Sequence, residues 1–372
     1  MAAFEGITWE QIEAFSRDGV VVIDNVLSPE EVDEAREGYH AYLKGAGVDH
    51  DDLGVTGKNL AFLSSTGGAG GILDIYYASF KLKVAENPNI VKSVCALWEF
   101  TYAKSSERVD SRCKDSGNSV GEGATNDGVW NHPHGTFDPR RPLMAVDRVC
   151  YRLPDVLSLH LGRQKDRLKE RPLQRHLAPH LDCCPPHESV EIRGKGIEMW
   201  RPIQGFVALT DCLEPNCGGF ECCYGFHREF LQWAEKRRWS TKKGRNGQDQ
   251  VIPPPCLGNF SPIRPIEDAD VIRRFQHVPC KAGSLVLWDN RIPHANSKVH
   301  EGNSPREVLY VSLLPKVKQN MNYVEDQLVR FKEGSLPSDF WQAAAADDIR
   351  QHAQDHEFTT LGKQMMGIKE YQ

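Results

Sequence analysis

The sequence predicts a single, mainly β domain flanked by helices. Apolar runs typical of strands recur along the chain, and turn-forming residues bound them. The clearest runs are 144–153, 203–211, 283–288 and 306–313. No internal repeat or linker divides residues 1–372, which favours one domain over two. From residue 322 onward the pattern turns helical, through the alanine-rich stretch at 341–346.

The chain opens with well-marked elements. Thr8 and Gln11 form the pattern of a capping box, which predicts a short helix that ends near Gly19. The run Val20–Ile23 is expected to be a buried strand. A Ser-Pro-Glu-Glu sequence starting at Ser28 then predicts a second helix, with serine as its cap.

Composition argues against several classes of protein. The 372 residues carry a formal net charge of −6. The molecule as a whole therefore lacks the positive charge that nucleic-acid-binding proteins use to attract phosphates. No apolar run approaches the length of a membrane span, and the N-terminus has neither the basic nor the apolar part of a secretory signal. We therefore expect a cytoplasmic protein with a small-molecule substrate, whose 11 cysteines are reduced thiols rather than a disulfide framework.

Four polar residues stand in the order that one kind of metal chemistry requires. His180 and Asp182 lie in Pro-His-Leu-Asp, His294 follows the run 283–288, and Arg306 comes 12 positions after His294. Two histidines and one carboxylate form the facial triad of non-haem iron(II), which leaves the opposite face of the metal open. A nearby arginine can hold the far carboxylate of 2-oxoglutarate by a bidentate contact.

Strand geometry fits this spacing. Residues i and i+2 of a strand point to the same face, so His180 and Asp182 would project together while Leu181 faces away. Arg306 opens the strand-like run 306–313. We expect this strand to lie antiparallel beside the segment that carries His294, with Arg306 next to that histidine.

Other segments are less specific. Residues 64–71 are glycine-rich but lack the ending of a phosphate loop, so a flexible loop is favoured. Residues 105–130 predict a long loop or lid. The run 236–245 is basic with tryptophans nearby and could bind phosphates, although a solvated helix end is the commoner explanation. The cysteines of 212–223 contain no Cys-x-x-Cys pair, so buried reduced thiols are favoured over a zinc site.

Short motifs occur along the chain in a specific order. They are Phe15–Ile23, Pro179–Asp182, Phe206–Asp211, Asn216–His227, Gly283–Trp288, His294 and Arg306. Together they resemble the phytanoyl-CoA dioxygenase-like family. The stretch Asn216–His227 departs from that family's pattern, because Tyr224 and Phe226 replace the usual proline and serine. The resemblance covers about residues 8–315 and leaves 316–372 as a helical C-terminal extension.

The resemblance implies a double-stranded β-helix, or jelly-roll barrel, with helices packed outside. It also implies a requirement for Fe(II), 2-oxoglutarate and O2. The implied metal ligands are His180, Asp182 and His294, and the implied carboxylate anchor is Arg306. Further candidates for the co-substrate pocket are Ser297, Trp200 and Gln204.

The substrate is less well specified. Arg148 and Arg152 share one face of the predicted strand 144–153, and that face could present them to a carboxylate or phosphate of a small molecule. An ordinary ion-pair role for both is equally open. His134, in Asn-His-Pro-His, is a further substrate-binding candidate, although a role at the polar surface also remains open.

Three functions remain open on these grounds. The first is hydroxylation of a small, carboxylate-bearing metabolite. The second is a natural-product tailoring oxidase that cyclises or desaturates an amino-acid-like substrate, as the kainoid-forming oxygenases do. The third is a non-catalytic jelly-roll binding protein, against which the complete set of triad and anchor residues argues.

Overall fold

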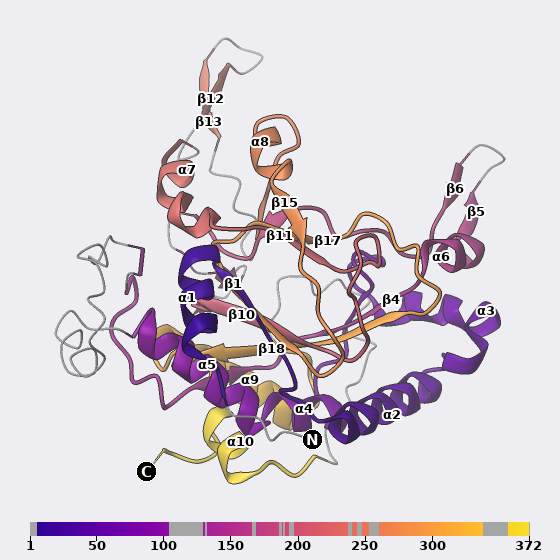
Figure 1. Cartoon of the computed structure of the whole chain (residues 1–372), viewed down its shortest axis with the longest axis horizontal. Helices are drawn as coiled ribbons and strands as arrows, with labels where there is room; N and C mark the ends of the chain where they lie inside the picture. The colour runs from indigo at the N-terminus through magenta and orange to yellow at the C-terminus, as the bar shows by residue number, and fades with distance from the viewer. Residues whose placement is uncertain are drawn as a thin grey trace.

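Two antiparallel β-sheets pack together at the centre of the computed structural model, and helices cover the outer face of the larger one (Figure 1). The structure describes residues 6–103, 129–130, 132–165, 169–185, 188, 190–192, 197–236, 240–243, 248–252, 260–337 and 356–371. Most of the predicted lid at 105–130, much of the basic run at 236–245 and the alanine-rich stretch at 341–346 lie outside the described residues.

The larger sheet contains seven strands within the described part of the chain. Their order is β1 (Val20–Ile23), β16 (Leu285–Asp289), β10 (Ile203–Ala208), β18 (Arg306–Leu314), β4 (Val149–Arg152) and β2 (Ile72–Leu73), and β3 (Leu143–Ala145) also pairs with β18. Each of these pairings is antiparallel.

The smaller sheet faces the inner side of the larger one. Its order is β14 (Ser261–Pro262), β7 (His180–Leu181), β17 (His294–Asn296), β11 (Phe220–Cys223) and β15 (Phe275–His277). Two-stranded hairpins are β5 (Arg163–Lys165) with β6 (Lys169–Arg171), β8 (Val190–Ile192) with β9 (Ile197–Met199), and β12 (Ser240–Lys243) with β13 (Asp249–Ile252). The first and third hairpins project from the body of the molecule in Figure 1.

Helices surround the sheets. They are α1 (Trp9–Asp18), α2 (Pro29–Gly45), α3 (Leu53–Thr56), α4 (Ser79–Ala85), α5 (Pro88–Phe100), α6 (Asp155–Leu161), α7 (Phe230–Lys236), α8 (Ala269–Ile272), α9 (Lys318–Glu333) and α10 (Thr360–Met365). Short 3-10 turns are η1 (His50–Asp52), η2 (Gly57–Leu63) and η4 (Phe226–Arg228). Among the described residues, no helix combines the length and apolar character needed to cross a bilayer.

The predicted start of the chain is confirmed. The Thr8 side chain accepts from the Gln11 backbone N–H, and the Gln11 side chain returns a contact to the Thr8 backbone. Gly19 ends α1 with a φ of 72°, a left-handed conformation that glycine adopts without steric cost. A second capping box at Ser28 starts α2, with Glu31 as its partner.

Alternate residues of the central strands divide the core in two. On β10, Phe206 and Ala208 point between the two sheets, whereas Val207 lies on the helix-covered face. On β16, Val286 points between the two sheets and Leu287 lies on the helix-covered face. Because both faces are buried, these strands appear in the sequence as continuous apolar runs. The predicted fold class, mainly β with flanking helices and a jelly-roll core, is confirmed.

The predicted strand at 144–153 is interrupted. The chain forms β3 and β4 instead, with residues 146–148 between them. The Gln327 side chain of α9 accepts the Val146 backbone N–H, and the Asp147 carboxylate accepts that of Arg148. Side chains therefore accept the Val146 and Arg148 backbone N–H groups at this point, although the Arg148 carbonyl still accepts from the Tyr310 backbone N–H. The apolar pattern does not reveal this. Consequently Val146 packs in the helix-side core, while Cys150 lies between the sheets.

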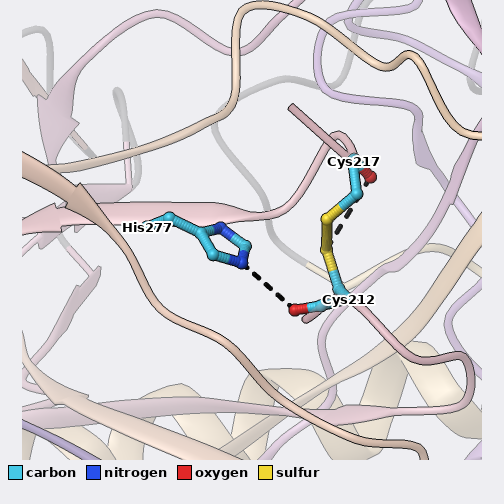
Figure 2. A group of neighbouring side chains, drawn as sticks. All are labelled: Cys212, Cys217 and His277. Atoms are coloured by element: carbon cyan, nitrogen blue, oxygen red, sulfur yellow. Dashed lines mark hydrogen bonds between the residues drawn. A yellow bond between two sulfur atoms is a disulfide. The ribbon is translucent and has the colours of Figure 1, made fainter. Parts of the chain in front are cut away.

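The expectation that all cysteines are reduced is wrong for one pair. Cys212 and Cys217 form a disulfide, with their Cα atoms 6.0 Å apart (Figure 2). The turn between β10 and β11 brings them within the range that a disulfide requires, and the spacing in the sequence does not disclose this. His277 Nε2 lies 3.2 Å from the Cys212 carbonyl oxygen. The other cysteines that the structure describes are free.

Burial of Lys81 should make stability depend on pH. The side chain lies on α4 in the core, and burial lowers its pKa to about 8, against about 10.4 in an unfolded chain. Between these values the unfolded state binds more protons, so stability rises with pH. We expect Lys81→Met to raise the free energy of unfolding by up to about 3 kcal/mol at pH 7 and by much less near pH 10.

Urea unfolding of wild type and variant at both pH values measures this difference. The matched control is Lys83→Met on the same helix, where the exposed ammonium pairs with Glu34. That change should alter stability by less than about 1 kcal/mol, with no trend between the two pH values. An equal effect of Lys81→Met at both pH values would contradict the assignment.

Candidate metal centre

Cross-strand pairing brings the two predicted histidine ligands together. The register of β7 and β17 sets His180 opposite His294, and their ring centroids are 4.4 Å apart. Asp182 follows β7. Its Oδ1 lies 3.3 Å from His180 Nε2, and its Oδ2 lies 3.4 Å from His294 Nε2. The ligand atoms of the three residues lie within 4.8 Å of one another, a spacing that a single metal ion can bridge.

Backbone carbonyls hold both imidazoles in place. His180 Nδ1 donates to the Ala178 carbonyl at 2.8 Å, and His294 Nδ1 donates to the Ile292 carbonyl at 2.9 Å. A carbonyl oxygen can only accept, so the Nδ1 atoms carry the protons and each Nε2 keeps a lone pair in the neutral ring. Metal-binding histidines in proteins are oriented by the same contact.

Polar neighbours hold the carboxylate. Gln204 Nε2 donates to Asp182 Oδ2 at 2.8 Å, and Arg201 Nη2 lies 3.9 Å from the same oxygen. Burial opposes ionisation, but His180 and His294 hold the pKa of Asp182 well below its usual range. Burial lowers the pKa of His294; at His180 the Asp182 charge outweighs burial and raises the pKa. An ionised carboxylate beside two imidazoles suits a divalent cation.

A cavity of about 480 Å³ opens onto these three groups. Its wall includes the cationic side chains of Arg148 and Arg201 and the aromatic rings of Phe260, Trp288 and Tyr310. The volume lies in the range of small-molecule sites, and the mixture of apolar wall and a few polar groups is typical of them.

Arg306 lies on the larger sheet rather than beside His294. The predicted adjacency is wrong, because the chain crosses to the opposite sheet between β17 and β18. The guanidinium lies over the Phe206 ring, 5.1 Å from its centroid. Phe206 contacts Phe220, and Phe220 contacts His294, at centroid distances of 5.7 and 5.6 Å. Arg306 thus extends into the space between the sheets, where it contacts Phe206 and Cys150, and it is not among the residues that line the cavity.

The remaining candidates divide into two groups. Gln204 and Arg148 line the cavity, as expected for residues near a ligand. Trp200 and His134 do not; their rings contact each other at a centroid distance of 5.5 Å, and the Trp200 indole is fully buried.

Ser297 and Arg152 also lie outside the cavity wall. Ser297 is buried just after β17, where its backbone N–H donates to the Gly219 carbonyl at 2.7 Å. Arg152 is the direct cross-strand partner of Arg306, and its Nη2 donates to Asp155 at 2.7 Å. The structure therefore places Arg152 beside the predicted anchor, next to the cavity wall but not among the residues that line it.

Strand alternation could have found several cavity residues that were not predicted. Tyr310 and Ser312 share the inward face of β18 with Arg306, since every second residue of a strand points the same way. Asn296 stands two residues after His294 and also lines the cavity. No sequence signal marked the contribution of the glycine-rich segment 64–71, which adds Thr66 and Ala69 to the wall.

The model of the Gig2-like family matches residues 191–368, just under half of the chain. This stretch contains His294 and Arg306 but not His180 or Asp182. No curated protein sequence matches significantly. Since the matched family is not the phytanoyl-CoA dioxygenase-like one, that resemblance stays a prediction.

Solved structures resemble the chain over most of its length. GIG2, GlcNAc Inducible Gene 2 from Candida albicans, has a TM-score of 0.66 at 16% identity, covering 99% of this chain and 78% of that one. The hypothetical protein JW0805 from Escherichia coli has a TM-score of 0.60 at 16% identity, covering 97% and 82%. HygX from Streptomyces hygroscopicus, solved with nickel and 2-oxoglutarate, reaches 0.44 at 11% identity, covering 84% and 88%. The first two similarities establish a shared fold, and the third is too weak to support an argument.

Proposed function

We propose that this chain is an Fe(II)- and 2-oxoglutarate-dependent oxygenase that hydroxylates an unactivated C–H bond of a small, carboxylate-bearing metabolite. One observation carries the proposal. Two imidazoles held at Nδ1 by backbone carbonyls meet one ionised carboxylate at the wall of a cavity of about 480 Å³. Two histidines and one carboxylate, with open positions on the metal, are typical of non-haem iron(II) oxygenases.

The residues fit both the metal and the 2-oxo acid. His180, Asp182 and His294 would hold the iron, and Gln204 orients Asp182. Arg306 suits the far carboxylate of the acid, because its buried Nε and Nη2 have no hydrogen-bond partner in the described structure. When bound, iron, O2 and the 2-oxo acid supply oxidising chemistry that protein side chains lack.

The cavity wall supports an acidic substrate. Three arginines line it, Arg148, Arg175 and Arg201, against two carboxylates, Asp147 and Asp182. Arg201 donates to Asp147 at 2.6 Å, and the charges of Arg201 and Arg148 both lower the pKa of Asp147. The arginine excess favours a guest that carries a carboxylate. The protein would then hold the substrate beside the metal, in a cavity whose wall also contains aromatic rings.

Iron-dependent release of succinate tests the reaction. We expect purified protein with Fe(II), 2-oxoglutarate and O2 to form succinate, faster when a pool of small carboxylic acids is added. Mass spectrometry of the product separates the reaction types: hydroxylation adds one oxygen atom, whereas cyclisation or desaturation removes two hydrogen atoms. Persistent absence of succinate across broad substrate pools would favour the non-catalytic binding protein instead.

Metal binding tests the triad without any substrate. We expect His294→Ala and Asp182→Ala each to weaken anaerobic Fe(II) binding by more than about 100-fold, since each removes a ligand. Gln204→Ala, which only frees the carboxylate, should weaken it by about tenfold. The matched control is His160→Ala on α6, an exposed histidine away from the cavity. Equilibrium dialysis with metal analysis measures the change; full iron occupancy in both ligand variants would contradict the site.

Arg148 tests the substrate class. With the acid identified by the succinate screen, we expect Arg148→Ala to raise its KM by about tenfold or more while succinate release stays iron-dependent. Arg228→Ala, at an exposed position in η4, serves as the matched control. Unchanged KM for Arg148→Ala would remove the basis for assigning the substrate carboxylate to this arginine.

A further inference from the structure

Arg152 and Arg306 form a buried pair of like charges. They are direct register partners on β4 and β18, and only 1% and 2% of their surfaces are exposed. Like charges directly opposite each other destabilise a sheet. Burial lowers the pKa of Arg152 against the opposing effect of Asp155, and the charge of Arg306 adds a smaller lowering. A compensating negative charge is therefore needed at this place.

The chain compensates only one of the two charges. Arg152 Nη2 donates to Asp155 Oδ1 at 2.7 Å. Arg306 Nη1 contacts the Cys150 sulfur at 3.7 Å, and in the described part of the chain no carboxylate lies within ion-pair distance of Arg306. Burial raises the pKa of the Cys150 thiol, which therefore stays neutral. The group formed by the two arginines and Asp155 keeps a net charge of +1.

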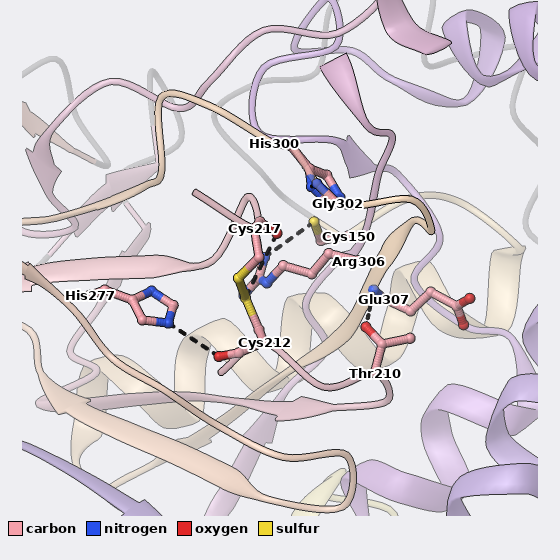
Figure 3. The surroundings of a disulfide bond; sticks show 9 residues. All are labelled: Cys150, Thr210, Cys212, Cys217, His277, His300, Gly302, Arg306 and Glu307. Atoms are coloured by element: carbon pink, nitrogen blue, oxygen red, sulfur yellow. Dashed lines mark hydrogen bonds between the residues drawn. A yellow bond between two sulfur atoms is a disulfide. The ribbon is translucent and has the colours of Figure 1, made fainter. Parts of the chain in front are cut away.

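Four nitrogen donors of this pair are also unsatisfied. Nε and Nη1 of Arg152 and Nε and Nη2 of Arg306 are buried without a hydrogen-bond partner among the described residues. Native proteins rarely leave such groups unpaired, because each costs free energy. Figure 3 shows the Arg306 side chain extending toward the Cys150 thiol and the Cys212–Cys217 disulfide, and sulfur is a weak acceptor.

Two glycines make room for Arg152. A Cβ on Gly71 would lie 2.6 Å from the Arg152 Cα, and one on Gly218 would lie 3.2 Å from its Cγ. Both glycines have a φ near 70°, which other residues rarely adopt. His300 also borders Gly218, and burial, then Arg152, lowers its pKa to about 4, so it adds no further charge near neutral pH.

We propose that Arg152 and Arg306 bind one carboxylate group together, the far carboxylate of the 2-oxo diacid co-substrate. This inference rests on the proposed function and adds Arg152 to it as a second co-substrate-binding residue. One carboxylate offers acceptors to the unpaired donors and brings the net charge of the group to zero. A phosphate dianion would instead leave an excess of negative charge.

A comparison of two acids isolates this contact. 2-Oxobutyrate has the same metal-binding end as 2-oxoglutarate but lacks the far carboxylate. We load the protein with Ni(II), which prevents turnover, and measure both dissociation constants by calorimetry. Wild type should prefer the diacid; Arg152→Met and Arg306→Met should each reduce this preference by about tenfold or more, with 2-oxobutyrate binding unchanged.

Two further variants complete the design. Arg228→Met, at an exposed arginine, is the matched control and should leave both constants unchanged. Arg152→Lys keeps the charge but loses the planar guanidinium, so it should reduce the preference for the diacid by an intermediate amount. It also replaces Arg152→Met in the test if that variant does not fold. The proposal is overturned if Arg306→Met loses the preference for 2-oxoglutarate over 2-oxobutyrate while Arg152→Met keeps it within twofold of wild type. If Arg152→Met does not fold, Arg152→Lys is judged by the same criterion.

Failure of the proposed function gives a different result. In that case the Ni(II) protein binds neither 2-oxo acid. The arginine pair is then tested alone: the melting temperature of metal-free protein is measured in sodium acetate and in sodium chloride at equal ionic strength. Acetate-specific stabilisation of wild type, lost in Arg152→Met and Arg306→Met, shows a carboxylate site with no link to a 2-oxo acid. Equal melting temperatures in both salts overturn the carboxylate assignment itself.

Discussion

The direct pairing of His180 with His294 across two short strands is the constraint on which the candidate site depends. β7 has two residues and β17 has three, so few backbone hydrogen bonds define the register. The neighbouring strands β14 and β11 stabilise it from both sides. A slip of one residue would turn either imidazole to the other face of the sheet. Fixed ligands therefore require a continuous smaller sheet, although each of its strands is short.

The two sheets contribute different parts of the proposed site. The smaller sheet supplies the histidines, and the larger sheet supplies Arg306 and its partner Arg152. Phe206 and Phe220 pack between them. Because packed sheets keep a separation of about 10 Å, the distance between the proposed metal ligands and the arginines is set by the core rather than by loops. In the proposed site, this spacing would let residues far apart in the sequence reach one co-substrate without a mobile element.

The sequence indicated the local elements and the ligand types, but not how the strands combine. The capping boxes at Thr8 and Ser28 were predictable, because their contacts lie within three residues. The grouping of His180, Asp182 and His294 was predictable from residue type and order, and their role as metal ligands stays a prediction. The placement of Arg306 was not, since only the path of the chain decides whether successive strands share a sheet. The break between β3 and β4 depends on Gln327, more than 170 residues away, which no local pattern reports.

The interior cysteines have a consequence for how this protein can be studied. Cys183 and Cys222 are fully buried, and burial raises the pKa of both thiols well above the ordinary value. Thiolates rather than thiols react with alkylating reagents, so these side chains should stay inert while the native packing persists. Their labelling rate in a native-state experiment would then report how often the interior opens, without any engineered probe.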